Sequence, residues 1–306
     1  MLNARTHRGE RSPQSPQDAA LVNTMPMTWS IGIYVGESPL HFSPAPEVDN
    51  PVLSRSQVWD VPASFVADPF MIRAHGSWHM FFEAKNIATK KGEIGLAVSS
   101  DGFGWTYQRI VLSEEFHLSY PYVFESEGEY YMMPETLQAN HIRLYKAERF
   151  PGRWRHAANL IKGEFADPSI VFFEDRWWIF ACPRPFDHDE LRLFFSDSLF
   201  GPWVEHPQSP IIAGDPHVAR PAGRVVTFNG GLIRYAQDCS PRYGSRVSAF
   251  EISELTPTSY REIICERSPI PSIIGGGWNG RGMHHVDPHL YGDGKWIACV
   301  DGRYLE

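Results

Sequence analysis

A hairpin-like segment recurs five times along the 306 residues, and this repeat constrains the fold more than any other feature. Each copy has a proline at the entrance of a β-rich run, a Gly or Asp turn, and a second aromatic-rich run, which is typical of a β-hairpin. The copies are ADPFMIRAHGSWHMFFEA from Ala67, SYPYVFESEGEYYMMPET from Ser119, ADPSIVFFEDRWWIFACP from Ala166, the weaker VARPAGRVVTFNGGLIRYAQD from Val218, and HVDPHLYGDGKWIACVDG from His285. A unit therefore recurs about every fifty residues, marked by Pro69, Pro121, Pro168, Pro221 and Pro288.

A second repeated piece lies between the hairpins. It contains a strand, an acidic residue, a Gly-containing turn and a Trp that opens another strand, as in IGLAVSSDGFGWTYQ from Ile94. Two hairpins per unit give four strands, and a four-stranded unit of this length is typical of a β-propeller blade. We therefore predict an all-β fold, a five-bladed β-propeller with four-stranded blades around a central channel. The alternative is a β-sandwich, but a sandwich needs no shared proline entrance at regular spacing.

A strand-like segment, Met27 to Gly36, precedes the first complete unit. We expect it to complete the last blade and close the ring. Residues 27–304 would then form a single propeller, after a polar and disordered tail at residues 1–26. The last two residues, 305–306, are compatible with an expression scar.

Acidic residues outnumber basic residues, 36 to 28, which gives a formal charge of −8. The chain has no basic run that could track phosphates, so neither nucleic acid nor an anionic membrane surface is an expected partner. The N-terminal segment lacks the apolar core of a secretory signal or membrane anchor. We expect a cytoplasmic protein without membrane insertion, and the sequence does not indicate its oligomeric state.

The strand entrances place charged and polar residues at equivalent positions of different blades, which meet near the axis of a propeller. The residues before the five prolines are Asp68, Tyr120, Asp167, Arg220 and Asp287. The ends of the return strands add Glu83, Glu135 and Asp238. Because burying unpaired charges is costly, this set predicts a polar ligand site. In the competing interpretation, each Asp caps a turn, or the carboxylates are neutralised by Arg184, Arg220 and Arg246.

Crowded carboxyl groups separate in pKa, so that one stays ionised while another keeps its proton at neutral pH. Cleavage of a glycosidic bond uses such a pair, with one group as proton donor and the other as base or nucleophile. Aromatic residues such as Tyr243 offer flat faces for a sugar ring. The sequence therefore favours a carbohydrate as the ligand and a glycosidic bond as the target.

The entrances and the piece FSDSLFGPW resemble the five-bladed propeller glycosidases of glycoside hydrolase families 43, 32 and 68. A closer resemblance is to the N-terminal propeller domain of glucosamine inositolphosphorylceramide transferases, in the segments WSIGIYVGESPLHF, FVADPF, MPET, FADPSI and MHHVDPH. This resemblance runs from about Trp29 to Arg303. It implies a carbohydrate-active propeller.

The family 43 pattern implies roles for individual carboxylates. Asp68 falls on the base of that pattern, and Asp167 falls on the Asp that tunes the acid and orients substrate. The acid Glu of the pattern belongs near the fourth blade, where this sequence has Arg220, so the candidate acid is Glu135 or else Glu83. The predicted catalytic residues are Asp68, Asp167 and Glu135.

The departure at the fourth blade keeps two other functions open. One is a non-catalytic carbohydrate-binding propeller in glycan assembly, and the other is glycosyl transfer or phosphorolysis with an anionic leaving group held by arginines. The expected substrate-binding residues are Glu83, Tyr120, Arg184, Arg220, Asp238, Tyr243, Arg246, His285 and Asp287.

The histidine-rich segment around His284 and His285 predicts no metal site. Adjacent residues of an extended strand point to opposite faces, so these two imidazoles would not share one ion. No cofactor is expected, although the resemblance to family 43 keeps a hydrated Ca²⁺ on the axis as an alternative.

Overall fold

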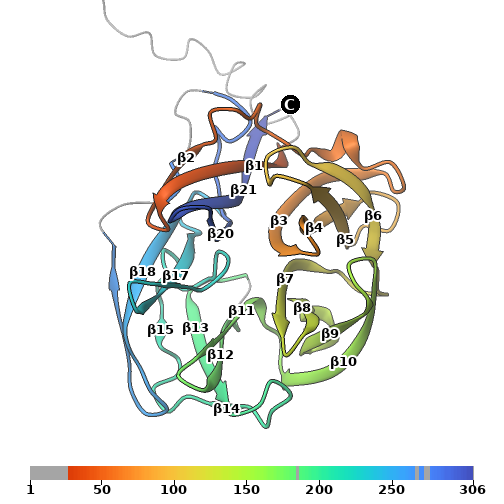
Figure 1. The fold of residues 1–306 in the computed structure, drawn as a ribbon. Coiled ribbons are helices and arrows are strands. Elements are labelled where there is room, and N and C mark those ends of the chain that lie inside the picture. The colour runs from red at the N-terminus through yellow and green to blue at the C-terminus, as the bar shows by residue number, and fades with distance from the viewer. Residues whose placement is uncertain (1–26, 184–185, 266–268, 272–275, 306) are drawn as a thin grey trace, which may run out of the picture.

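The computed structural model describes residues 27–183, 186–265, 269–271 and 276–305, and these form five antiparallel sheets in a ring around a central axis (Figure 1). The predicted five-bladed β-propeller is confirmed. Within the described residues the only helical elements are two short 3-10 turns, η1 (Arg55–Gln57) and η2 (Leu137–Ala139).

Each blade is built from consecutive strands, apart from the last. The first blade contains β3 (Ala63–Ala74), β4 (Ser77–Asn86), β5 (Gly92–Ser99) and β6 (Thr106–Leu112). The second contains β7 (Ser119–Ser126), β8 (Glu129–Glu135), β9 (His141–Arg149) and β10 (Arg153–Lys162). The third contains β11 (Ala166–Phe173), β12 (Arg176–Cys182), β13 (Glu190–Ser196) and β14 (Val204–Glu205), and β15 (Ile212–Ala213) pairs with β13. The fourth contains β16 (Val226–Phe228), β17 (Gly231–Asp238), β18 (Arg246–Leu255) and β19 (Tyr260–Ile264).

The fifth blade joins the two ends of the described chain. Its strand order is β20 (Val286–Tyr291), β21 (Lys295–Leu305), β1 (Met27–Ser38) and β2 (His41–Pro44). Strand β1 pairs antiparallel with β21 from Met27 opposite Leu305 to Gly36 opposite Trp296. The N-terminal strand therefore completes the last blade and closes the ring, as expected from the sequence, and leaves no long edge open at the junction.

Tight turns join the two inner strands of each blade. Between β3 and β4 the turn residues His75 and Gly76 have φ values of +51° and +81°. Two consecutive residues with positive φ form a type I′ turn, whose twist matches that of the flanking strands. The recurring Gly of the sequence repeat is the residue that adopts this conformation most readily.

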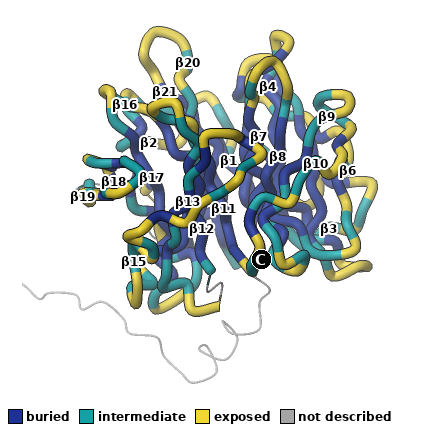
Figure 2. The backbone as a smooth tube through the Cα atoms, turned by 90° about the horizontal axis from the view of Figure 1, so that it is seen from below, coloured by how far each residue is buried: buried dark blue, intermediate teal, exposed yellow. Residues whose placement is uncertain are grey.

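The hydrophobic core lies between neighbouring blades. Trp78 and Met80 of the first blade pack in one buried cluster with Ile297 of the fifth, and Phe70 packs in another with Met132 of the second. Buried residues follow the strands, whereas exposed residues concentrate in the loops at both ends (Figure 2). Burial of each such side chain contributes roughly 1.5–3 kcal/mol, so blade contacts stabilise the whole ring.

The described residues contain no helix with the length and apolar character that a membrane span requires.

Candidate functional site

The residue before the marker proline has a left-handed backbone in three blades. The φ values are +52° for Asp68, +47° for Tyr120 and +47° for Asp167. At each of these positions the pairing with the next strand also shifts register, as between Ala67 and Phe70 in the first blade. Such bulges redirect side chains, and a left-handed conformation costs a non-glycine residue roughly 1–3 kcal/mol. The repeat thus builds the same local distortion three times at one end of the inner strands.

The fifth blade has no such bulge. Strand β20 keeps an uninterrupted register, with Asp287 opposite Cys299. The Asp287 carboxylate accepts hydrogen bonds from the backbone N–H of Met71 (2.6 Å) and from Nε of Arg224 (2.6 Å), and it lies 2.8 Å from Nε2 of His289. Burial would raise the pKa of Asp287, but Arg224 and His289 lower it to about 2. The geometry makes Asp287 a buried ion pair between blades and gives no support to the substrate contact expected for it.

Arg220 joins two of the predicted catalytic carboxylates. Its Nε lies 2.6 Å from Oδ2 of Asp167, and its terminal nitrogen lies 3.6 Å from Oε2 of Glu135. Glu135 also accepts the backbone N–H of Asp167 (3.2 Å), and Gln237 donates to Asp167 Oδ2 (2.7 Å). Burial and the charge of Asp167 raise the pKa of Glu135 to about 8 despite Arg220. Glu135 therefore favours its protonated form at neutral pH, beside the carboxylate of Asp167.

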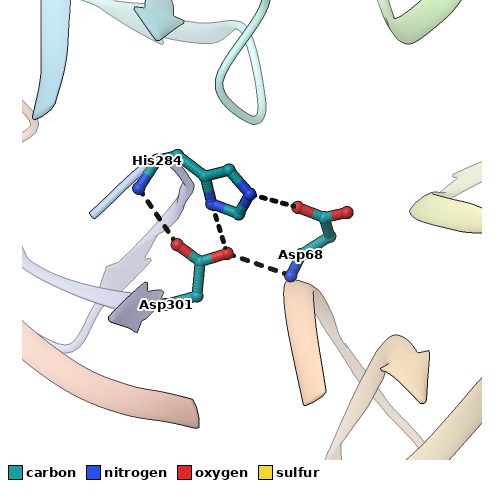
Figure 3. Close-up of side chains that lie close together, drawn as sticks. All are labelled: Asp68, His284 and Asp301. Atoms are coloured by element: carbon teal, nitrogen blue, oxygen red, sulfur yellow. Dashed lines mark hydrogen bonds and ion pairs between the residues drawn. The ribbon is translucent and has the colours of Figure 1, made fainter. Parts of the chain in front are cut away.

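Asp68 forms the other half of the cluster. Its carboxylate accepts the backbone N–H of Tyr120 (3.3 Å), and Oδ1 lies 3.6 Å from Nε2 of His284. The Asp68 backbone N–H donates to Oδ2 of Asp301 (3.1 Å), and Nδ1 of His284 lies 2.6 Å from the same oxygen (Figure 3). Burial raises the pKa of Asp68 to about 7, although His284 opposes the shift.

Glu83 lies next to Asp68 within the first blade. It stands at the end of β4, opposite Ala67, and its Oε1 is 3.4 Å from Nε2 of His117. Burial and the charge of Asp68 raise the pKa of Glu83 well above its usual range, whereas burial lowers the pKa of His117 to about 4. A neutral imidazole offers Glu83 no compensating charge, so this carboxyl group also favours its protonated form.

Two of the predicted ligands, Tyr120 and His285, are completely buried, at 0% and 1% exposed. The Tyr120 hydroxyl lies 2.8 Å from the Ser169 hydroxyl and donates to the carbonyl of Gly223 (3.0 Å). His285 packs against Phe70 and Tyr120 with ring centroids 4.5 and 5.3 Å apart. Burial lowers the pKa of His285 to about 4. The Tyr120 side chain thus bridges blades, while its backbone N–H supports Asp68.

The remaining predicted ligands divide into two groups. Tyr243 belongs to the cluster, because Arg220 lies over its ring at 5.1 Å from the centroid and the ring meets His284 edge-on. Asp238 instead pairs with Arg246 (2.8 Å) and His217 (2.9 Å). Arg184 lies outside the described residues.

Sequence reasoning missed Asp301 and the role of His284. Asp301 stands near the end of the second strand of the fifth-blade hairpin, as Glu83 and Glu135 do in theirs. The repeat alignment contains this signal, since CVDG matches FFEA and MPET. His284 lies just before β20, and in the sequence it stands out only as the neighbour of His285.

Among the described residues, one group of His, Cys, Asp or Glu side chains has donor atoms close enough together to hold a metal ion. It consists of Asp68, His284 and Asp301, whose donor atoms all lie within 4.8 Å of one another. The shortest contact in this group is closer than the spacing of two ligands on one ion. The 2.6 Å between His284 Nδ1 and Asp301 Oδ2 is an ion-pair distance, whereas two ligands of one tetrahedral zinc stand about 3.3 Å apart. Calcium would need six or more oxygen ligands.

The five sheets and the carboxyl cluster at their axis define a five-bladed β-propeller with a buried acidic site. The model for the family "glucosamine inositolphosphorylceramide transferase 1, N-terminal" matches residues 25–303, and the chain belongs to this family. Glucosamine inositolphosphorylceramide transferase 1 of Oryza sativa subsp. japonica is 38% identical over 297 residues, and that of Arabidopsis thaliana is 34% identical over 300 residues. Each alignment covers 90% of this chain but only 40% and 39% of the relative, so the chain spans about two-fifths of their length.

Solved glycoside hydrolases share the fold. An exo-β-1,3-galactanase from Clostridium thermocellum superposes with a TM-score of 0.58 and 13% identity, covering 72% of this chain and 54% of the galactanase. A family 117 glycoside hydrolase from Zobellia galactanivorans gives a TM-score of 0.52 and 14% identity, covering 78% and 84%. At these identities the likeness shows the fold alone.

Proposed function

We propose that this propeller acts on a glycosidic bond of a carbohydrate or glycoconjugate, with carboxyl groups at the axis as acid and base. The observation that carries the proposal is the buried axial cluster itself, in which Arg220 contacts Asp167 and Glu135 while Asp68 faces His284. The pKa shifts of the carboxyl groups are consistent with it. The pKa of Glu135 is raised to about 8 and that of Asp68 to about 7. Near neutral pH, Glu135 can then donate a proton, while a large fraction of Asp68 is ionised and can act as the base. Glycosidic cleavage requires one carboxyl group in each of these two states.

The roles follow from the surroundings of each group. Asp68 is the base or nucleophile, because His284 is a cationic neighbour that favours its ionised form. Glu135 is the acid. The backbone N–H of Asp167 donates to Glu135 and orients it, and the nearby Asp167 carboxylate helps to raise the pKa of Glu135. Arg220 limits the repulsion between Asp167 and Glu135.

Glycosyl transfer with an anionic leaving group is less well supported. It would use Arg220 and Arg246 as anion ligands, but Arg220 is engaged by Asp167 and Glu135, and Arg246 by Asp238. An incoming phosphate would have to compete with these carboxylates, which lie at 2.6–3.6 Å.

The second candidate is a carbohydrate-binding propeller without turnover. Two observations favour it: the fourth blade carries Arg220 in place of an acid, and Asp68 and Asp167 are only 6% and 2% exposed. In this function the same cluster would accept hydrogen bonds from sugar hydroxyls.

A panel of aryl glycosides and nucleotide sugars tests the proposal on the wild-type chain and on Asp68→Asn. We expect release of the aryl group from at least one glycoside and a loss of roughly 100-fold or more in Asp68→Asn. Asp197→Asn, at an exposed ion pair with Arg176, is the matched control and should retain full activity. Unchanged turnover in Asp68→Asn would remove Asp68 from the mechanism, whereas saturable binding without turnover would favour the binding propeller.

A further inference from the structure

His284 lies between two carboxylates that come from different blades. Its Nδ1 is 2.6 Å from Oδ2 of Asp301, and its Nε2 is 3.6 Å from Oδ1 of Asp68 (Figure 3). When both carboxyl groups are ionised, the two ring nitrogens face them favourably only if both nitrogens carry protons, because a neutral imidazole has one donor and one acceptor. The placement between two carboxylates therefore favours the imidazolium form.

The Asp301 carboxylate also accepts backbone hydrogen bonds from both His284 and Asp68. Its Oδ1 accepts the backbone N–H of His284 (3.1 Å), and its Oδ2 accepts the backbone N–H of Asp68 (3.1 Å). Asp301 is completely buried in β21, where it pairs with Ile31 of β1. One fixed carboxylate thus sets the position of His284 relative to Asp68.

Aromatic rings fix the plane of the imidazole. Trp29 stacks on His284 with ring centroids 4.0 Å apart and an interplanar angle of 19°. Tyr243 meets the His284 ring edge-on, at 5.2 Å and 85°. The guanidinium of Arg303 lies over the Trp29 ring at 5.2 Å from its centroid. A ring held by such contacts loses little further freedom when it positions a carboxylate.

We propose that Asp301 and His284 form a positioning dyad for Asp68, in which Asp301 orients the imidazole and protonated His284 holds the Asp68 carboxylate charged and in place. The role of Asp68 as base rests on the proposed function. The dyad itself is a property of the folded chain and can be measured without turnover.

The charged groups around the dyad support this direction. Asp68 is influenced by His284, Asp167, Asp301 and Arg220, with Glu83 beside it in the first blade. His284 is influenced by Asp301, Asp68 and Asp167, and its neighbour His285 is held neutral by burial. Burial would lower the pKa of His284, but Asp301 and Asp68 raise it above its usual value. If His284 lost its charge, Arg220 would be the remaining cation acting on Asp68 among these groups.

Imidazole NMR of the full chain tests the dyad directly. The ¹⁵N shifts of His284, assigned by their disappearance in His284→Gln, should report an imidazolium at pH 7. In Asp301→Asn the titration midpoint of His284 should fall by about one to three pH units. A neutral His284 in the wild type at pH 7, or an unchanged midpoint in Asp301→Asn, would overturn the proposal. The wild-type titration decides this even if Asp301→Asn fails to fold.

The pH dependence of turnover, or of sugar binding, tests the effect on Asp68. His284→Gln should move the acidic limb to higher pH by about one unit or more, because the Asp68 pKa rises when the cation is lost. His289→Gln is the matched control, since His289 pairs with Asp287 in the same blade, and its acidic limb should stay in place. An unmoved limb in His284→Gln would contradict the positioning role. An imidazolium in the NMR titration together with full turnover in Asp68→Asn would refute the proposed function of Asp68 while the dyad itself stands.

Discussion

The guanidinium of Arg220 lies 2.6 Å from the carboxylate of Asp167, and both residues are almost completely buried, at 8% and 2% exposed. The pair joins the entrance of the third blade to that of the fourth. Because Arg220 also reaches Glu135 at 3.6 Å, one cation compensates carboxyl groups from two blades.

Replacing Arg220 by Met should destabilise the fold by roughly 3–5 kcal/mol, because the substitution leaves a buried carboxylate without its partner. Urea denaturation measures the loss. Arg261→Met is the control: Arg261 also pairs with an acidic residue, Glu254, but the two side chains are 77% and 38% exposed, so we expect a change below about 1 kcal/mol. Equal losses in the two variants would contradict this account.

The stability of the wild type should decrease as the pH rises from about 7 to 8, above the range in which histidines with lowered pKa, such as His117 and His285, act in the opposite direction. Glu135 has a pKa near 8 in the folded chain and an ordinary, lower pKa when unfolded, so the folded state binds more protons across this range. Each such proton contributes a slope of up to about 1.4 kcal/mol per pH unit. The raised pKa of His284 acts in the same direction, because its contribution is lost as the pH rises through the folded value.

Glu135→Gln should flatten this slope without abolishing it, since Asp68 and His284 still titrate. Denaturant unfolding at constant ionic strength over this pH range checks the prediction. A stability that increases with pH, or a slope that Glu135→Gln leaves unchanged, would contradict the assigned protonation of Glu135.

Arg224→Met should destabilise the ring by roughly 3–5 kcal/mol. Arg224 donates to Asp287 (2.6 Å) of the fifth blade and to the carbonyls of Met71 (3.3 Å) and Val123 (2.9 Å), so it joins blades across the axis. Without it, the carboxylate of Asp287 loses its guanidinium partner and retains the contact with the imidazole of His289 (2.8 Å). Thermal and chemical unfolding measure the loss. A Tm unchanged from the wild type would show that the ion pair is dispensable.

Tyr120→Phe should cost roughly 1–3 kcal/mol of stability and leave sugar binding intact. The lost hydroxyl deprives the buried backbone of Gly223 and the Ser169 hydroxyl of a partner. The backbone N–H that Tyr120 donates to Asp68 remains. Calorimetric titration with the best sugar of the panel provides the test. A large loss of affinity at unchanged stability would instead support the ligand contact predicted from the sequence.

The sequence repeat was sufficient to predict the five blades, since hairpin spacing and turn chemistry are local properties. It also predicted that Asp68, Asp167 and Arg220 would meet, because equivalent positions of neighbouring blades converge. It did not predict where Asp287 would lie. Asp287 has the same Asp-Pro signature as Asp68, but β20 lacks the bulge of β3. Whether a bulge forms depends on how the strand pairs with its neighbour, and this cannot be read from the local Asp-Pro motif.

The partners of the site were harder to predict than its carboxylates. Whether Arg220 binds a ligand or neutralises Asp167 depends on distances between blades. In the structure Arg220 pairs with Asp167 and Arg246 pairs with Asp238, as in the competing interpretation in which arginines neutralise the carboxylates. The dyad of His284 and Asp301 joins a loop to a strand end. The repeat alignment marks Asp301, but no spacing pattern in the sequence marks His284.

The most direct test of the central claim compares two leaving groups on one sugar, using the sugar that the panel identifies. An acid catalyst is needed for a poor leaving group such as an alkyl alcohol, and hardly at all for a good one such as dinitrophenolate. If Glu135 protonates the leaving oxygen, Glu135→Gln should lower turnover of the alkyl glycoside by roughly 100-fold to 10,000-fold and leave that of the dinitrophenyl glycoside nearly unchanged. Equal losses on both substrates, or no loss on either, would contradict the assignment of the axial carboxyl groups as acid and base.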